Sequence, residues 1–267
     1  MSQATSVRRK QIMSQILDQK QVTVKELAAA MGVSDATVRR DLKALADEQG
    51  LKLIHGGAAL PRERDFSFQA RLLRSGHEKK VIGELASKFI HDGDHVFLDS
   101  GTTCSELVPY VKRMHEITIL ANSARLALEL DATGVQLFLI GGEYRPDRMD
   151  TVGPMAVGTL NQVRGYTAFI GADGLSMDFG PSASDLASAH LHRQVVANAL
   201  STVLLVDHSK FGAASLFQII EWSKIATVIT DQEPDASWAE FFNEQNINVV
   251  YPGSNGHEDA QDNGQQH

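Results

Sequence analysis

The feature that most constrains the fold is a series of short apolar runs that alternate with helical patterns. Helical spacing separates most of the runs, notably over 78–90, 105–113, 123–130 and 186–200. Strands that are apolar on both faces and alternate with helices predict a mostly parallel sheet covered on both sides. We therefore expect an α/β domain over residues 77–252. The expected strands are 96–98, 117–121, 135–140, 166–170, 203–206, 225–229 and 247–251.

Polar and small residues follow five of these runs, where the predicted strands end. The carboxyl ends of parallel strands share one edge of a sheet, and ligands of open α/β folds bind there. We therefore expect these residues to form one ligand site. Its predicted members are Asp99, Ser100, Gly101, Thr102, Thr103, Asn122, Gly141, Gly142, Asp173 and Lys210.

The chemistry of these residues favours a small anionic or polyol ligand. Residues 99–103 open a predicted helix, and their backbone amides, hydroxyls and glycine suit a phosphate group. Carboxylates can accept hydrogen bonds from sugar hydroxyls, and Lys210 can neutralise phosphate charge. For Asp99 and Asp207, a purely structural role as helix N-caps is an equal alternative.

The first 60 residues follow a different pattern. Helical spacing over 6–19 is followed by a short helix at 25–30, a turn containing Gly32, and a third helix over 35–48. Two helices joined by a short glycine turn are typical of a helix-turn-helix, whose second helix enters the major groove of DNA. Residues 51–59 form two short extended pieces around a glycine pair, which we interpret as the wing of a winged helix.

The third helix separates core residues from candidate DNA contacts. Val38, Leu42 and Leu45 have the spacing of a buried face, so its polar residues project elsewhere. Arginine pairs with guanine edges or with phosphate oxygens, and which arginine reads bases stays open. The alternatives are a turn role for His55 and, for the whole segment, a three-helix docking or dimerisation head. The predicted contacts to double-stranded operator DNA are Ser34, Asp35, Thr37, Arg39, Arg40, Lys43, Lys52 and His55.

Charge is divided unevenly along the chain. Residues 1–80 hold 15 Lys and Arg against 9 Asp and Glu, a net charge of +6. Residues 81–267 hold 10 against 24, a net charge of −14. DNA phosphates attract the first part and repel the second, so the division predicts a DNA-facing head on an acidic body.

The remaining segments and the composition limit the other possibilities. We expect a winged helix-turn-helix over 1–60, an arginine-rich linker over 61–76 and a disordered polar tail over 253–267. The linker arginines contact DNA, a partner subunit or only solvent. No apolar run approaches the roughly 20 residues that cross a bilayer, so we expect no membrane segment and a cytoplasmic protein. The single cysteine, Cys104, excludes an internal disulfide, and we expect neither a metal nor a cofactor.

Residues 33–42, Val-Ser-Asp-Ala-Thr-Val-Arg-Arg-Asp-Leu, and the later His55-Gly56-Gly57-Ala58 resemble the N-terminal signature of the DeoR family of sugar-catabolism repressors. The resemblance extends from about Arg8 to Asp231, and the effector domain is similar to the ribose-5-phosphate isomerase and CoA-transferase superfamily. It implies that a phosphorylated sugar is the inducer and releases the repressor from DNA. Because helix-turn-helix proteins usually read paired half-sites, we expect a homodimer or homotetramer.

One stretch departs from the family pattern. After the glycine near position 180, many members carry a glutamate and then a lysine in the following helix. In this chain Asp185 is our candidate for the acid, with His190 or Arg193 for the positive group. A solvent-facing position is an equal alternative for His190, and we expect His192 to face solvent.

The alternative function is a sugar-phosphate isomerase with an added DNA-binding head. Proton transfer in such an enzyme needs a carboxylate base and a nearby cation, for which Asp173 or Asp185 with Lys210 are candidates. The fused head argues against an enzyme, because a metabolic isomerase does not need one. We therefore predict a regulator.

Overall fold

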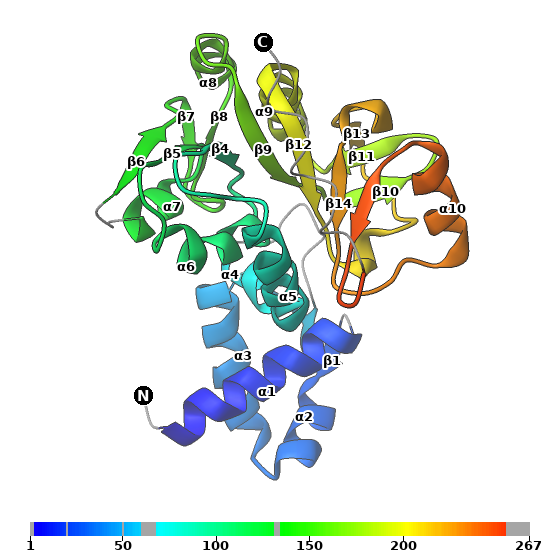
Figure 1. Ribbon diagram of the computed structural model, residues 1–267. Coiled ribbons are helices and arrows are strands. Elements are labelled where there is room, and N and C mark those ends of the chain that lie inside the picture. The colour runs from blue at the N-terminus through cyan, green and yellow to red at the C-terminus, as the bar shows by residue number, and fades with distance from the viewer. Residues whose placement is uncertain (1–2, 20, 50, 60–67, 131–133, 255–267) are drawn as a thin grey trace, which may run out of the picture. The chain divides into compact units, whose positions relative to one another are not determined.

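The computed structural model describes residues 3–19, 21–49, 51–59, 68–130 and 134–254 (Figure 1). The chain divides into two compact units, Met1–Arg74 and Ser75–His267. Within the described ranges, no helix has both the length and the hydropathy that crossing a bilayer requires.

The N-terminal unit is a winged helix-turn-helix, as the sequence predicted. Three helices are followed by a hairpin, and a short strand before α2 pairs with that hairpin to give the antiparallel order β1-β3-β2. A further short helix, α4, lies in the second half of the predicted linker. The elements are α1 (Gln3–Gln19), β1 (Gln21–Thr23), α2 (Val24–Met31), α3 (Asp35–Gln49), β2 (Lys52–Ile54), β3 (Gly57–Ala59) and α4 (Phe68–Leu73).

Local signals in the sequence account for the boundaries of α2 and α3. Thr23 and Glu26 form a capping box, in which each side chain accepts a hydrogen bond from the other residue's backbone amide. Gly32 ends α2 in the left-handed conformation, with φ of 63°. The hydroxyl of Ser34 then accepts the amide of Thr37 at 3.3 Å and caps α3.

The hydrophobic core of this unit joins all three helices to the wing. Ile12 of α1, Leu27 of α2 and Val38 of α3 are fully buried. In the wing, a Cβ on Gly57 would lie 2.0 Å from the carbonyl oxygen of Val22. Only glycine therefore allows β3 to approach β1 this closely.

The C-terminal unit is built on a seven-stranded, fully parallel sheet of order β15-β14-β12-β9-β4-β5-β6. All seven predicted runs contribute a strand, so the α/β prediction is confirmed. The strands are β4 (His95–Leu98), β5 (Ile117–Ala121), β6 (Val135–Leu139), β9 (Tyr166–Gly171), β12 (Ala199–Leu205), β14 (Thr227–Ile229) and β15 (Asn248–Val250).

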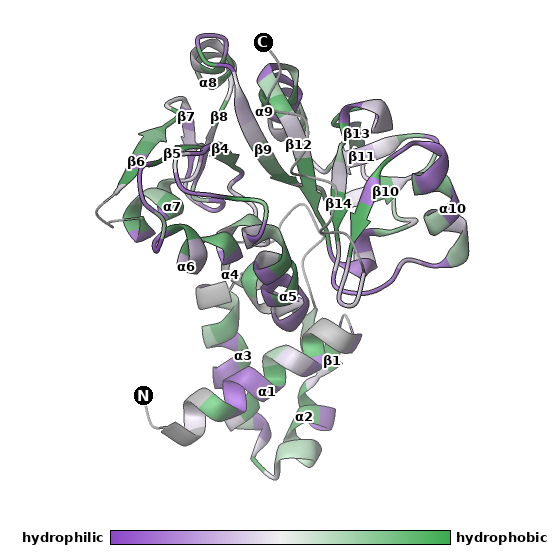
Figure 2. Ribbon diagram, in the orientation of Figure 1, coloured by the Kyte–Doolittle hydropathy of each residue, from purple (hydrophilic) through white to green (hydrophobic). Residues whose placement is uncertain are grey.

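Both faces of the sheet are buried under helices. Successive residues of β4 alternate between the two cores, with Val96 and Leu98 in one and Phe97 in the other. The apolar strand residues appear green in Figure 2. The covering elements are α5 (Gly76–Ser87), η2 (Cys104–Leu107), α6 (Val108–Val111) and α7 (Ala124–Glu129) on one face, and α8 (Pro154–Leu160), α9 (Leu186–Asn198) and α10 (Ala236–Glu244) on the other.

Two small antiparallel sheets were not predicted. A hairpin follows β6. A three-stranded sheet of order β10-β11-β13 takes two strands from the segment after β9 and the third from the segment after β12. Residues 60–67 of the predicted linker and 255–267 of the predicted tail lie outside the described residues. The added elements are β7 (Glu143–Arg145), β8 (Asp150–Val152), β10 (Gly174–Ser176), β11 (Gly180–Ala183), η3 (His208–Lys210), β13 (Phe217–Gln218) and η4 (Trp222–Lys224).

Candidate functional site

The α3 helix presents a row of free basic side chains. Arg39, Arg40 and Lys43 are exposed, and none has an ion-pair partner among the described residues. Ser34 and Asp35 are exposed at the N-terminal end of α3, and the candidates Lys52 and His55 are exposed on and beside the wing. Unpaired cations on a recognition helix and a wing suit the phosphate backbone and base edges of DNA.

Two of the predicted contacts also have local structural roles. Thr37 is half-buried, and its hydroxyl lies 2.9 Å from that of Ser34, so both belong to the N-terminal cap of α3.

Asp41 on the same helix is 3% exposed and contacts Nε of Arg8 at 2.6 Å and Nε of Arg9 at 3.1 Å. These ion pairs attach α1 to α3 and so fix the orientation of the candidate recognition helix.

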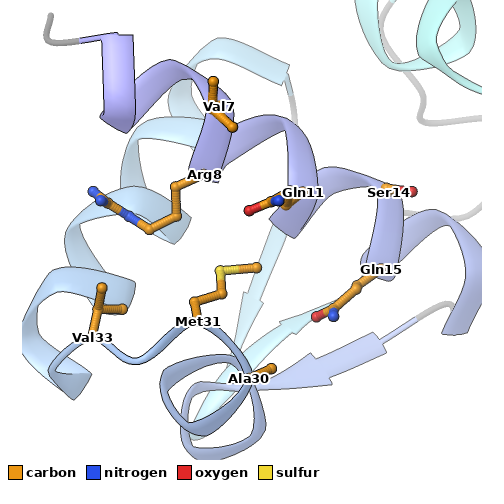
Figure 3. A pocket seen from close by; sticks show the side chains of 8 residues that line it. All are labelled: Val7, Arg8, Gln11, Ser14, Gln15, Ala30, Met31 and Val33. Carbon is orange, nitrogen blue, oxygen red and sulfur yellow. The ribbon is translucent and has the colours of Figure 1, made fainter.

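A pocket opens between α1 and the turn after α2 (Figure 3). The guanidinium of Arg8 is the charged group of its lining and is held by Asp41. The pocket therefore presents mainly uncharged groups, and we assign it no ligand. It is lined by Val7, Arg8, Gln11, Ser14, Gln15, Ala30, Met31 and Val33.

In the C-terminal unit, the five predicted polar segments follow five neighbouring strands, β12, β9, β4, β5 and β6. Because all these strands are parallel, their carboxyl ends lie at one edge of the sheet. The chain leaves β4 toward β5 and β6 and later returns to the other side of β4 with β9. The gap between the ends of β4 and β9 is thus a topological switch point, where ligands of such folds bind.

The loop after β4 keeps two backbone amides available. The amide of Ser100 donates to Oδ1 of Asn122 at 3.1 Å, and that of Gly101 donates to Oδ2 of Asp99 at 3.2 Å. No acceptor among the described residues receives the amides of Thr102 and Thr103, which immediately precede η2. In the part of the predicted cradle formed by this loop, these are the two amides without an acceptor in the described ranges.

His192 corrects an expectation from the sequence. We expected this side chain to face solvent, but it is 7% exposed. Its Nε2 lies 2.8 Å from Oδ1 of Asp99, at the switch point. Burial alone raises the pKa of Asp99, yet the charge and hydrogen bond of His192 and the amide of Ser100 lower it to about 2. Asp99 is therefore an ionised, buried partner of His192 and does not cap η2.

A partly buried ion-pair network adjoins this pair. Arg145 donates from Nε and Nη2 to Asp150 at 2.8 and 2.6 Å, and from Nη1 to Asp185 at 2.8 Å. Arg148 donates from Nη1 to the second oxygen of Asp185 at 2.6 Å. The network joins the β7–β8 hairpin to the N-terminus of α9, where Asp185 accepts the amide of Ser188. Burial raises the pKa of Asp185, but the Ser188 amide and both arginines lower it to about 2.

The partners of Asp185 differ from those expected. His190 is exposed. Arg193 donates to the carbonyl oxygens of Ile219 and Gln218 beside β13. The positive partners of Asp185 are instead Arg145 and Arg148, from a different part of the chain.

Other residues at this edge of the sheet have structural roles. Oδ2 of Asp173 accepts the amide of Ser184 at 2.8 Å and so shapes the segment before α9. A Cβ on Gly142 would lie 2.5 Å from the carbonyl oxygen of Val152, so this glycine is required by the protein's own backbone. Asp207 caps η3 by accepting the amide of Ser209 at 3.0 Å, which is the structural alternative considered for it.

Other predicted members of the ligand site lie at the same edge of the sheet. Asn122 is buried and bridges the loop after β4 to the carbonyl oxygen of Thr151. Gly141 is exposed, with nothing near the position of an added Cβ. Lys210 is half-buried on η3, in the segment that follows β12.

Four charged or polar residues of this edge were missed from the sequence: Arg145, Arg148, Asp150 and His192. The first three fall within eight residues of the Gly141-Gly142 pair, and that density of charge after a strand end was the available signal. His192 offered none, because its burial depends on how α9 packs beside the loop after β4.

Known proteins match this chain over nearly its whole length. The DeoR-like helix-turn-helix domain matches residues 8–64, and the DeoR C terminal sensor domain matches residues 74–232. The HTH-type transcriptional regulator IolR of Bacillus subtilis is 30% identical over 236 residues, which are 88% of this chain and 94% of that protein. The putative aga operon transcriptional repressor of Escherichia coli O157:H7 is 29% identical over 255 residues, 93% of this chain and 94% of that protein.

Solved structures are more distant. Ribose 5 phosphate isomerase A from Neisseria gonorrhoeae is 16% identical, with a TM-score of 0.36, over 52% of this chain and 54% of that one. At this distance the likeness carries no argument about activity.

A winged helix-turn-helix joined to an α/β sensor domain defines a DNA-binding transcriptional regulator. This chain belongs to the DeoR family. The isomerase alternative is not favoured, because relatives that match almost the full chain are regulators with the same DNA-binding head.

Proposed function

We propose that this regulator represses genes of carbohydrate catabolism and that a phosphorylated sugar releases it from operator DNA. We further propose that it acts in the cytoplasm as a homodimer or homotetramer. The proposal that a phosphorylated sugar binds this protein rests on the amides of Thr102 and Thr103, which have no acceptor among the described residues and lie beside the switch point of the sheet. Relatives named as a lactose phosphotransferase system repressor in Staphylococcus aureus and as the repressor GlcR in Bacillus subtilis support the carbohydrate assignment.

On the DNA side, α3 supplies Arg39, Arg40 and Lys43 to the major groove and the flanking phosphates. Ser34, Asp35 and Thr37 lie at the N-terminal end of α3, which in helix-turn-helix proteins contacts base edges. Lys52 and His55 of the wing contact the backbone beside them. Apart from Thr37, which is half-buried, these residues are exposed, and the cations of α3 have no ion-pair partners among the described residues.

On the sensor side, the phosphate binds at the amides of Thr102 and Thr103, with the loop residues Ser100 and Gly101 close to it. The sugar hydroxyls bind toward Asp173, Asn122 and the glycine pair 141–142, and Lys210 adds positive charge from the β12 end. The polar groups at this edge come from five strands, so one ligand can contact several loops at once. Ligand binding therefore changes how these loops pack against one another.

Release of DNA requires that the sugar bind the DNA-incompetent arrangement more tightly than the competent one. A switch from almost fully bound to almost fully free needs about 5 kcal/mol of differential affinity. In a symmetric oligomer two ligand sites can share this difference in ligand affinity. Both DNA-binding units must be placed correctly to occupy paired half-sites, so both sites act on the same equilibrium.

The experiment that tests the sensing half is a thermal-shift screen of the full chain. The panel holds ribose 5-phosphate, fructose 6-phosphate, glucose 6-phosphate and glycerol 3-phosphate, each beside its unphosphorylated parent. A ligand at 100 times its dissociation constant adds about 2.7 kcal/mol of stability. We expect stabilisation by at least one phosphorylated compound and not by its parent. Thr102→Asp places a negative charge in the cradle and should remove that response, and an unchanged response would show that the cradle is misplaced.

A further inference from the structure

One nitrogen in the sensor site lacks a hydrogen-bond partner. Nδ1 of His192 is buried and finds no donor or acceptor among the described residues. The other ring nitrogen, Nε2, is engaged by Asp99 at 2.8 Å. A buried polar atom without a hydrogen-bond partner destabilises the folded state. Such atoms are rare in native proteins and each needs an explanation, of which an absent ligand is one.

The position of this nitrogen points to a ligand. Asp99 directly follows β4, and its amide donates to the carbonyl oxygen of Phe169 in β9 at 3.1 Å. The His192–Asp99 pair therefore lies at the switch point between β4 and β9, where ligands of open α/β sheets bind. The free amides of Thr102 and Thr103 belong to the same loop as Asp99.

We propose that His192 contacts the ligand directly, donating a hydrogen bond from Nδ1 to an oxygen of the phosphorylated sugar, and that Asp99 is the positioning residue that orients its ring. This inference rests on the proposed function. By engaging Nε2, Asp99 fixes the tautomer and leaves Nδ1 as the only ring nitrogen for the ligand. Asp99, which the sequence suggested as a ligand contact, thus acts through His192.

The charged groups around His192 favour its protonated form. Burial lowers the pKa of the ring, the charge and hydrogen bond of Asp99 raise it, Arg148 lowers it and Asp173 raises it. The net effect holds the pKa above its ordinary value. In the protonated ring Nδ1 carries a hydrogen and can donate it to a phosphate oxygen. When the ring loses a proton, Asp99 retains the hydrogen on Nε2, and the bare Nδ1 then repels the same oxygen.

Ligand affinity should therefore fall as the pH rises through the pKa of His192. A sugar phosphate has its own second ionisation near pH 6. Above about pH 7 that group is fully charged, so a further change in affinity reports a group on the protein. The test is isothermal titration calorimetry of the full chain at pH 7, 8 and 9 with the four phosphorylated compounds of the screen.

The discriminating variant is His192→Gln. A glutamine amide nitrogen can replace Nε2 beside Asp99, but it places nothing at Nδ1. We expect at least about tenfold weaker binding than wild type at pH 7. Between pH 7 and 9 the wild type should lose affinity and this variant should not. His95→Gln is the matched control, since His95 is exposed at the opposite end of β4, and it should behave as wild type.

Asp99→Asn tests the positioning role and does not depend on His192→Gln folding. Without the carboxylate charge the pH midpoint of ligand binding should move to lower pH. Equal affinity and an equal pH profile in wild type and His192→Gln would overturn the inference and leave the proposed function standing. A loss of affinity that is the same at every pH would also overturn it, because it indicates a structural role. No binding of any compound to the wild type would contradict the proposed function and, with it, this inference.

Discussion

Replacing Arg145 should strongly destabilise the sensor domain. It contacts Asp150 through two nitrogens, at 2.8 and 2.6 Å, and its side chain is only 18% exposed. The Asp150 side chain is 2% exposed. In Arg145→Met that carboxylate stays buried, and its remaining partners are Arg148 at 3.8 Å and the hydroxyl of Ser100 at 3.3 Å. Breaking a buried ion pair by removing one partner costs about 3 to 5 kcal/mol, and the remaining arginine places our expectation at about 3 kcal/mol.

Urea unfolding of the full chain measures this change selectively. Both tryptophans, Trp222 and Trp238, lie in the hydrophobic core of the sensor unit, so their fluorescence reports that unit. For a domain of this size, about 3 kcal/mol corresponds to a Tm lower by roughly 6 to 12 °C. Arg164→Met, at an exposed arginine of the same unit, is the control and should stay within about 0.5 kcal/mol of wild type.

A second substitution separates charge burial from lost packing. In Arg145→Met/Asp150→Asn no carboxylate is left unpaired at that position, so the double variant should be more stable than Arg145→Met alone. If Arg145→Met stays within about 1 kcal/mol of wild type, the buried carboxylate does not depend on Arg145 and the explanation is wrong. A double variant that shows the full sum of both losses would contradict it as well.

Three further predictions concern acid, the wing and DNA. The carboxyls of Asp99 and Asp185 have pKa values of about 2 against an ordinary 3.8, so their stabilisation is complete above pH 3.8 and is lost as the pH falls toward 2. The urea midpoint should drop over that range and drop less in Asp185→Asn, and equal drops would contradict the assignment. Gly57→Ala should lower the Tm of the winged unit, since its Cβ would meet the Val22 carbonyl oxygen, and an unchanged circular-dichroism melt would count against so close an approach of β3 to β1. Arg40→Ala should weaken DNA binding in fluorescence anisotropy while leaving sugar-phosphate stabilisation intact, and loss of both would mean that Arg40 is structural.

Much of the fold could be predicted because local and global signals agree. The capping box of Thr23 and Glu26, the left-handed Gly32 and the cap at Ser34 are properties of adjacent residues, so sequence spacing is sufficient to find them. The seven parallel strands were predictable because burial on both faces leaves continuous apolar runs. The small sheets after β6 and β9 were missed because their strands are short and rich in polar and small residues.

The chemistry of the sensor edge was predictable only in part. Parallel strands necessarily bring their carboxyl ends to one edge, so Asp99, Asn122 and Asp173 could be grouped from the sequence. The partners that decide their roles are distant in the chain. His192 reaches Asp99 across 93 positions, and Arg145 reaches Asp185 across 40. The rotation of α9 about its axis determines which of its side chains faces the site, and no local pattern specifies that rotation.

A single binding experiment examines DNA recognition and sugar sensing together. A DNA duplex is first enriched from a random library by binding to the full chain, and its affinity is then measured by anisotropy with increasing amounts of the sugar phosphate that stabilises the protein. We predict an enriched sequence with two related half-sites, and an affinity that falls at least about tenfold, a coupling of about 1.4 kcal/mol, when the sugar phosphate saturates. An affinity that does not change at saturation, or a library that yields no preferred sequence, would contradict the assignment of this chain as a sugar-phosphate-released repressor.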